Sequence, residues 1–389
     1  MNNQEDLTEK EISVNPGRKE KVLRVVGNLS KRWFIEAFSG MAQGLFCTLI
    51  AGTIIGQIAV WCGENAFANA LRMIANVAKS LMGAGIGVGI ASRLKKSPLI
   101  VFTAAVTGMI GAFASDFVSV LIHNTPFVFA LGKPGNPIGA YVLTLFTTEI
   151  ASLYAGKTKL DIVLVPLGMM VLVLGGVFLA WPFIKLIELL GLGIAKAIEA
   201  GVAVKIVVGI FVAVIMGVLL TMPTSSAAIW VAITLAVSDP QYADALSIAG
   251  GAAVAGCAAH MIGFAVASFR ENGVSGLLSQ GIGTSMLQIP NIMKKPIIML
   301  PEIIASVFSG LAAVLLDLRC NQTGGGMGTS GLVGVFGAVT ESQNAGLPGW
   351  KIALGVALCL FVIPAAVSFG VSEWMRKKKI IEPGDQKLD

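Results

Sequence analysis

Long apolar runs separated by short polar breaks occupy most of the chain from residue 38 onward. The first five runs cover 38–61, 68–92, 98–122, 137–155 and 161–181. Five more follow at 202–221, 223–238, 243–268, 297–317 and 350–374. Most are near the ~20 residues that an α-helix needs to cross a bilayer, and the short run at 223–238 suggests a re-entrant segment. The pattern predicts an all-α polytopic membrane protein with about ten transmembrane helices and re-entrant hairpins.

The stretch between the two sets of runs has a different pattern. Lys185, Glu188, Lys196 and Glu199 recur near helical spacing among leucines and isoleucines. This favours an amphipathic helix along the membrane surface, with a tilted span as the alternative. The predicted organisation is a cytoplasmic tail (1–33), a first membrane half (34–181), a linker helix (182–201), a second half containing the transport region (202–375) and a cytoplasmic tail (376–389).

Composition and charge agree with a membrane protein. Apolar residues make up 55% of the 389 residues and charged residues only 13%, which excludes an ordinary soluble domain. Lys and Arg gather in the first 32 residues, after the second and fourth runs, and at 376–379. The positive-inside rule then places both termini in the cytoplasm, in a bacterial cytoplasmic (inner) membrane. We attribute these basic clusters to topology and expect membrane lipid, and no nucleic acid, as their surroundings.

Polar side chains inside apolar runs are the first candidates for a site, because they are costly in a membrane. Glu149 lies within one run, and its alternative role is an ion pair with Arg72 or Lys79. Glu341 ends a short apolar stretch after a glycine-rich turn, and His260 lies among small residues. Glu302 is close to a helix end and is given an ordinary structural role.

The stretch 321–343 combines three consecutive glycines, a second glycine-rich turn and Glu341. Backbone free of side chains can approach a solute closely, so Gly325, Gly326 and Thr340 join Glu341 as predicted substrate-binding residues. Thr340 and Glu341 echo Thr148 and Glu149 at the same spacing after a glycine, as in transporters built from two related halves.

Two polar turns complete the set of candidates. Thr224 and Ser225 follow a span, and Asn136 lies in a Gly/Pro-rich loop. These side chains could cap the next helix or bind a polar solute, and the two roles are compatible.

Other chemistry is poorly supported. The five cysteines have no metal-ligand spacing, and there are only two histidines. We therefore predict no metal, no cofactor and no catalytic residue.

Three short motifs carry a family resemblance. The sequence GAVTES (337–342) resembles the Gly-Ile-Thr-Glu signature of the membrane (IIC) components of sugar phosphotransferase systems. GNPIGAY (135–141) and GKTKLDIVLVPL (156–167) resemble the type 2 EIIC group, which includes perfringolysin-regulator-like proteins. The resemblance implies a homodimer in which an interface domain holds a transport domain that moves as an elevator.

The resemblance also implies that Glu341 hydrogen-bonds sugar hydroxyls and that His260 assists. Ser342 and Val339 depart from the usual signature, so the sugar specificity does not transfer. Phosphorylation needs a nucleophile on a soluble domain, which we do not find here, so IIA and IIB functions are expected on separate proteins. This chain is then at most the permease component of such a system.

We therefore predict a transporter of a small, sugar-like solute. Two alternatives stay open: a membrane sensor or regulator of the perfringolysin-regulator type, and an ion-coupled secondary carrier in which Glu149 or Glu341 binds a proton or cation.

Overall fold

The structure is a computed structural model, and it describes residues 27–29, 31–124, 126, 135–222, 225–237 and 239–388. All regular secondary structure in these ranges is helical. By length and composition, six of the described helices can cross a membrane, or eight if each of two bent helix pairs forms one span. A multi-pass all-α membrane protein is thus confirmed, whereas the expected count of about ten spans stays a prediction.

The first half begins with a nearly continuous helix, 27–61, that passes through two π-helical segments. Its elements are η1 (Arg32–Ala37), α2 (Phe38–Leu45), η2 (Phe46–Ile50), α3 (Ala51–Trp61), α4 (Ala66–Ser80), α5 (Met82–Arg93), α6 (Pro98–Ala112), α7 (Ala114–His123) and α8 (Pro137–Tyr154). The chain bends by 52° between α4 and α5 and by 68° between α6 and α7. Glycines bring α2, α5 and α6 close together, as is common between membrane helices: a Cβ on Gly40 would lie 2.5 Å from the Gly89 carbonyl oxygen.

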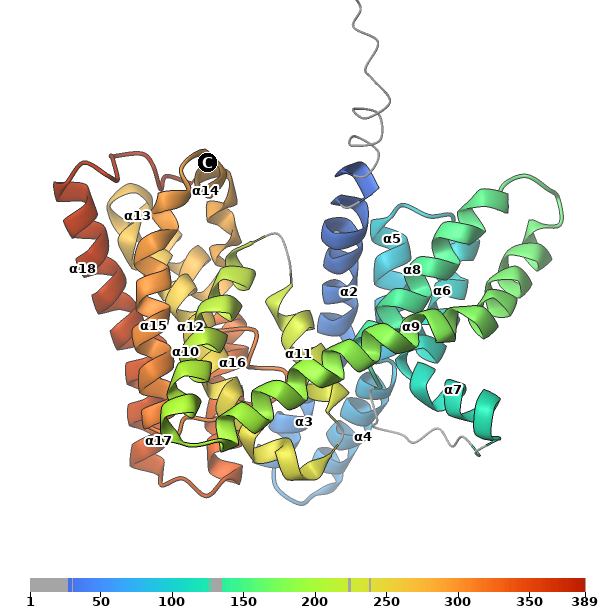
Figure 1. Ribbon diagram of the computed structural model, residues 1–389, viewed down its shortest axis with the longest axis horizontal. Coiled ribbons are helices and arrows are strands. Elements are labelled where there is room, and N and C mark those ends of the chain that lie inside the picture. The colour runs from blue at the N-terminus through green and yellow to red at the C-terminus, as the bar shows by residue number, and fades with distance from the viewer. Residues whose placement is uncertain are drawn as a thin grey trace, which may run out of the picture.

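A single long helix, α9 (Asp161–Glu199), connects the halves. It packs against α6, α7 and α8 at one end and against α10, α11 and α12 at the other, and Figure 1 shows it running across the molecule. We expected a separate linker helix to begin at Pro182, but Pro182 lies inside α9. Proline is tolerated there because neighbouring helices can satisfy the backbone group that it frees.

The second half surrounds α12 (Ala243–Ala267), most of whose residues are buried. Small residues dominate α12, so α10, α15 and α18 can pack closely around it. The elements of this half are α10 (Val202–Thr221), α11 (Ser226–Ala236), η3 (Pro240–Tyr242), α12 (Ala243–Ala267), α13 (Phe269–Leu278), η4 (Ser279–Gly283), η5 (Ser285–Gln288), α14 (Ile289–Lys294), η6 (Pro296–Met299), α15 (Leu300–Leu315), η7 (Ser330–Leu332), α16 (Val333–Asn344), α17 (Gly349–Ala357), η8 (Leu358–Val362) and α18 (Ile363–Lys377). The short α11 falls within the run that suggested a re-entrant segment.

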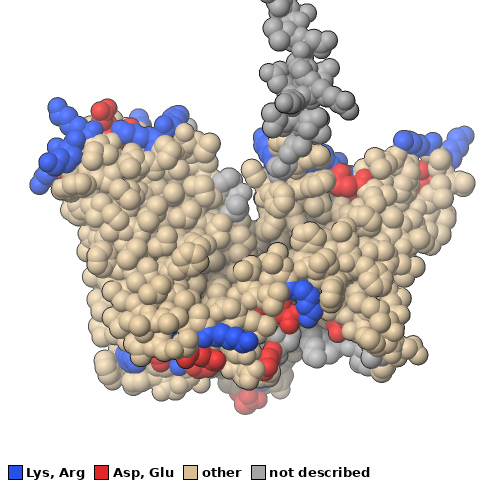
Figure 2. Space-filling view, viewed as in Figure 1, with Lys and Arg blue, Asp and Glu red and all other residues tan. Residues whose placement is uncertain are grey.

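Charge lies mainly at two edges of the molecule, with an apolar belt between them (Figure 2). The upper edge carries the C-terminus, together with the basic ends of α5, α14 and α18. An apolar belt between two polar edges is the surface that a bilayer requires.

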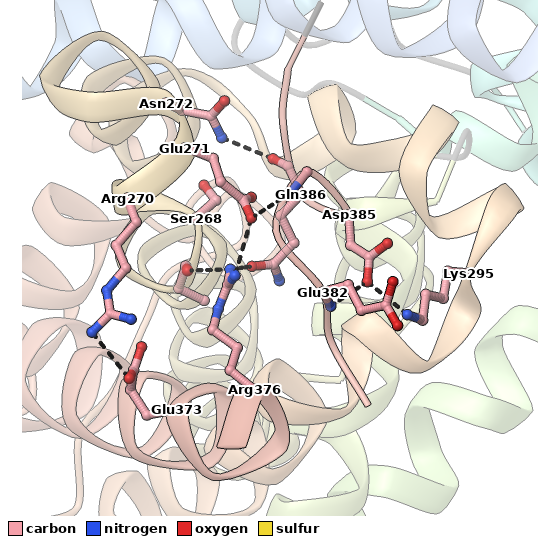
Figure 3. A network of polar contacts seen from close by, with 12 residues as sticks. Ser268, Arg270, Glu271, Asn272, Lys295, Glu373, Arg376, Glu382, Asp385 and Gln386 are labelled. Carbon is pink, nitrogen blue, oxygen red and sulfur yellow. Dashed lines mark hydrogen bonds and ion pairs between the residues drawn. The ribbon is translucent and has the colours of Figure 1, made fainter. Parts of the chain in front are cut away.

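The chain after α18 is folded back onto this upper edge (Figure 3). Lys295 Nζ lies 2.7 Å from Asp385 Oδ2, and the Gln386 carbonyl accepts hydrogen bonds from Asn272 at 2.8 Å and Gln288 at 2.9 Å. The segment that we expected as a simple tail therefore ties α13 and α14 to α18.

Candidate functional site

A cleft of about 540 Å³ is lined by residues of both halves. We call it the lower cleft, because α3 and α4, which contribute to it, lie toward the lower side of Figure 1. Its volume is in the range that small-molecule sites occupy in proteins. The first half contributes one wall, and α11, α12, α16 and the turn after α15 contribute the other. Its polar lining consists of Thr53, Lys79, Thr234, Asp239, Ser247, Asn321, Gln322, Thr323 and Glu341.

The turn at 321–324 is fixed against α16 by Asn321. Its side-chain oxygen accepts hydrogen bonds from the Gly324 amide at 2.8 Å and from the Thr323 hydroxyl at 3.1 Å. Gly337 on α16 leaves room for this side chain, since a Cβ there would lie 2.7 Å from Asn321 Oδ1. One helical turn further along α16, Glu341 faces the same cleft. The arrangement therefore places a carboxylate, an amide and a hydroxyl in the lining of one cleft.

Ionic groups also surround the lower cleft. Lys79 enters its lining from α4, and Asp239 enters from the start of η3. Arg319, two residues before Asn321, pairs with Asp244 and with Asp317, the latter at 3.3 Å. A solute with several hydroxyls could both donate to carboxylates and accept from an ammonium group here.

The glycine-rich turn packs within the protein. A Cβ on Gly325 would overlap the indole of Trp230, and a Cβ on Gly326 would lie 2.5 Å from the Ser226 carbonyl oxygen. The Ser226 hydroxyl donates to the Gly326 carbonyl at 2.6 Å. These glycines therefore bring backbone close to α11, and their role in binding a solute stays a prediction.

A second cleft, of about 450 Å³, opens toward the upper side, and we call it the upper cleft. The first helix lines it with Glu36, Ser39 and Gln43, and Arg93 adds a positive charge. Ser225 and Gly326, two of the predicted residues, also line it.

A small apolar cluster lies close to both clefts. It consists of Ile50 from η2, Met327 and Val333, with Ala227 packed against them. Leu49, next to Ile50, lines the lower cleft, and Met327 and Ala227 line the upper cleft. The cluster therefore joins residues that belong to or adjoin the lining of each cleft.

The other predicted residues lie in several places. Thr340 lines a third cavity of about 160 Å³ with Trp61 and Phe336, and this cavity shares Asn321 and Thr323 with the lower cleft. Asn136 caps α8, because its side-chain oxygen accepts from the amides of Ile138 and Gly139. Thr224 lies outside the described residues.

Glu149 has ion-pair partners that the sequence did not indicate. Arg32 Nε lies 2.9 Å and Lys96 Nζ 3.2 Å from its carboxylate, so neither Arg72 nor Lys79 pairs with it. Burial lowers the pKa of Lys96, and the carboxylate of Glu149 opposes that shift. Glu149 does not contribute to the lining of the two clefts.

His260 lies behind the wall of the upper cleft. It is fully buried, and its Nδ1 lies 2.9 Å from the Thr221 hydroxyl, which is also 2.9 Å from the Ser285 hydroxyl. The residues on both sides of Ser285, Thr284 and Met286, line the upper cleft. The substrate-binding role of His260 stays a prediction.

The comparisons with known proteins add the family. A family model described as "Phosphotransferase system, EIIC" matches residues 35–388. The chain belongs to this family. Searches of curated proteins and of solved structures returned no match. The predicted resemblance to the EIIC family is confirmed. EIIC proteins are membrane components of sugar transport systems, and they work with IIA and IIB components.

Proposed function

We propose that this EIIC protein binds a sugar or a similar polyhydroxylated solute in the lower cleft and carries it across the membrane. The observation that supports this most directly is the grouping of Glu341, Asn321 and Thr323 with Lys79 and Asp239 in one cleft between the halves. A carboxylate accepts hydrogen bonds from two hydroxyls, and hydrogen bonds to charged groups contribute about 1.5–3 kcal/mol each. The family membership supports the same class of solute.

We further propose that transport exposes the site alternately through the two clefts. In this proposal the cluster of Ile50, Met327 and Val333 acts as the barrier between them. Ile50 belongs to the first half and the other two to the second, so sliding of one half along the other would move this barrier. This is the elevator movement that the family resemblance suggested.

The remaining features of the proposal concern assembly and orientation. We place the upper edge, with the basic ends of α5, α14 and α18, in the bacterial cytoplasm. Separate IIA and IIB proteins would then meet the transporter at that edge. A homodimer is part of the same proposal.

A ligand screen tests the proposal. Purified protein is heated in the presence of a panel of monosaccharides, disaccharides and polyols. A ligand at 100 times its Kd should add about 2.7 kcal/mol to the stability of the native state and raise the melting temperature.

The matched variants are Glu341→Gln and Glu64→Gln. Glu64 is exposed and pairs with Arg72 at 2.7 Å without lining the lower cleft. Loss of the charged hydrogen bonds should weaken binding to Glu341→Gln by about 10- to 150-fold, whereas Glu64→Gln should bind like the wild type. Equal binding by all three proteins would refute the assignment of Glu341.

A further inference from the structure

A carboxyl group without a partner lies in the core of the second half. Glu302 occupies the first turn of α15 and is fully buried. Neither of its carboxylate oxygens has a hydrogen-bond partner among the described residues. An isolated ionised carboxylate in such surroundings would cost many kcal/mol, so the group must bind a positive charge, either a proton or a cation.

The surroundings of Glu302 come from two further helices. At Gly263 on α12, a Cβ would lie 2.9 Å from Glu302 Cγ and 2.5 Å from Ser368 Oγ on α18. The side chain of Glu302, through its Cγ, and the hydroxyl of Ser368 therefore pack against the same α-carbon. The hydroxyls of Ser368 and Ser372, one turn apart on α18, are buried and also lack partners. Glu302 and Ser368 thus pack side by side at Gly263, and none of the polar groups of Glu302, Ser368 and Ser372 has a hydrogen-bond partner among the described residues.

None of the described lysine or arginine side chains forms an ion pair with Glu302. The elements that pack against α15 are α10, α12, α18, η6 and η8. Their titratable groups are Lys205 on α10, Asp244, Cys257 and His260 on α12, Cys359 on η8, and Glu373, Arg376 and Lys377 on α18.

Arg376 and Lys205, two of the basic groups in this set, are engaged elsewhere, and His260 keeps one ring nitrogen, Nε2, without a hydrogen-bond partner among the described residues. Arg376 Nη1 lies 3.0 Å from Glu271, and Lys205 Nζ lies 3.7 Å from Asp317. Figure 3 shows that Arg376 also donates to the side chain of Gln386, at 2.8 Å, and Lys377 is exposed. Because these groups pair elsewhere, no lysine or arginine among the described residues supplies the positive charge at Glu302.

We propose that Glu302 is a proton-binding site, which holds one proton in the packed state and releases it when movement of the second half lets water reach the carboxyl. Glu302 is fully buried and packs closely at Gly263, and these dry surroundings favour a proton over a hydrated metal ion. Release breaks the O–H bond, leaves the electron pair on the carboxylate and transfers the proton to water. Reloading reverses these steps.

The position of Glu302 suits such a switch. The N-terminus of a helix stabilises a negative charge, while burial opposes it. Hydration removes the cost of burial and leaves the favourable effect of the helix N-terminus. The same carboxyl can therefore be neutral when it is packed and ionised when water reaches it. Linkage of this proton to solute movement rests on the proposed transport function, whereas proton binding at Glu302 does not.

Infrared spectroscopy of purified protein in nanodiscs tests the site. The wild type at neutral pH should show a carboxylic-acid C=O band that is missing from Glu302→Gln and unchanged in Glu64→Gln. Ser368→Ala keeps the carboxyl but removes its neighbouring hydroxyl, so its band should shift without disappearing. This second variant tests the site even if Glu302→Gln does not fold.

Two results would overturn the proposal. One is a wild-type spectrum with no band that depends on Glu302 or shifts with Ser368. The other is a melting temperature that rises with NaCl relative to choline chloride in the wild type and not in Glu302→Gln, since this would identify a sodium site.

Uptake by proteoliposomes tests the linkage. An inward proton gradient should stimulate solute uptake by the wild type and not by Glu302→Gln, while both proteins bind the solute. Absence of uptake with normal solute binding would count against the proposed function, and the proton site would still be decided by the infrared spectra.

Discussion

Replacing Gly326 by alanine should destabilise the protein, because the glycine-rich turn touches α11 through backbone atoms. The added Cβ would lie 2.5 Å from the Ser226 carbonyl oxygen, 2.7 Å from Ala227 Cα and 2.8 Å from Ala227 N. Backbone atoms cannot rotate away as a flexible side chain can, so the turn or α11 has to shift.

The size of the effect follows from two contributions. Overpacking in a well-packed interior costs about 1–3 kcal/mol. The shift also strains the hydrogen bond from the Ser226 hydroxyl to the Gly326 carbonyl, and a typical hydrogen bond contributes about 1 kcal/mol. Together they give a loss of about 2–4 kcal/mol in the free energy of unfolding.

The assay is equilibrium unfolding in mixed micelles, with Gly370→Ala as the matched control. Gly370 lies inside α18, and a Cβ there meets no atom within 4 Å. Alanine should stabilise that helix by about 0.5–1 kcal/mol relative to glycine. If Gly326→Ala unfolds like Gly370→Ala, the packing of the turn against α11 is not as we describe it.

Two further predictions concern charges at the upper edge. Glu149→Gln should lower the unfolding free energy by about 1–3 kcal/mol, because the side chain of Lys96 is only 5% exposed and loses its charged partner. In Glu188→Gln the partner is Lys185, whose side chain is 46% exposed, so the loss of unfolding free energy should be less than about 1 kcal/mol. Equal losses in the two variants would contradict the prediction. Burial alone would raise the pKa of Asp385, but the hydrogen bonds from Lys295 and from the Glu382 amide hold it below the ordinary value of 3.8. The Lys295–Asp385 pair should therefore stabilise the protein above about pH 4, and this contribution should disappear as the pH falls further. Asp385→Asn should remove this part of the pH dependence of the unfolding free energy. An unchanged pH dependence in Asp385→Asn would refute the prediction.

Much of the helical layout could be predicted from hydropathy, because a bilayer requires long apolar segments whatever their tertiary contacts. The bends could not, since apolar residues lie on both sides of the breaks after Ser80 and Ala112. The continuity of α9 through Pro182 was also missed. Proline and the charges that follow it suggest a helix start, and only packing against neighbours shows that the helix continues.

The site was predicted in part. Glu341 was found because a carboxylate among apolar residues is expensive. Lys79 and Asp239 were missed because they come from segments far apart in the sequence, and nothing local shows that they meet in one cleft. Glu302 was given an ordinary role because it lies close to a helix end, whereas the structure buries it fully and leaves its carboxylate oxygens without a hydrogen-bond partner among the described residues.

The central claim, that a solute binds in the lower cleft, is tested most directly by cysteine protection. Gln322 is exposed and lines this cleft, so Gln322→Cys in a background in which Cys47 and Cys62 are replaced by alanine should react with a hydrophilic maleimide. We predict that the solute found in the screen slows this reaction and leaves Glu64→Cys, outside the cleft, unaffected. Equal reaction rates at Gln322→Cys with and without a solute that binds would contradict the account.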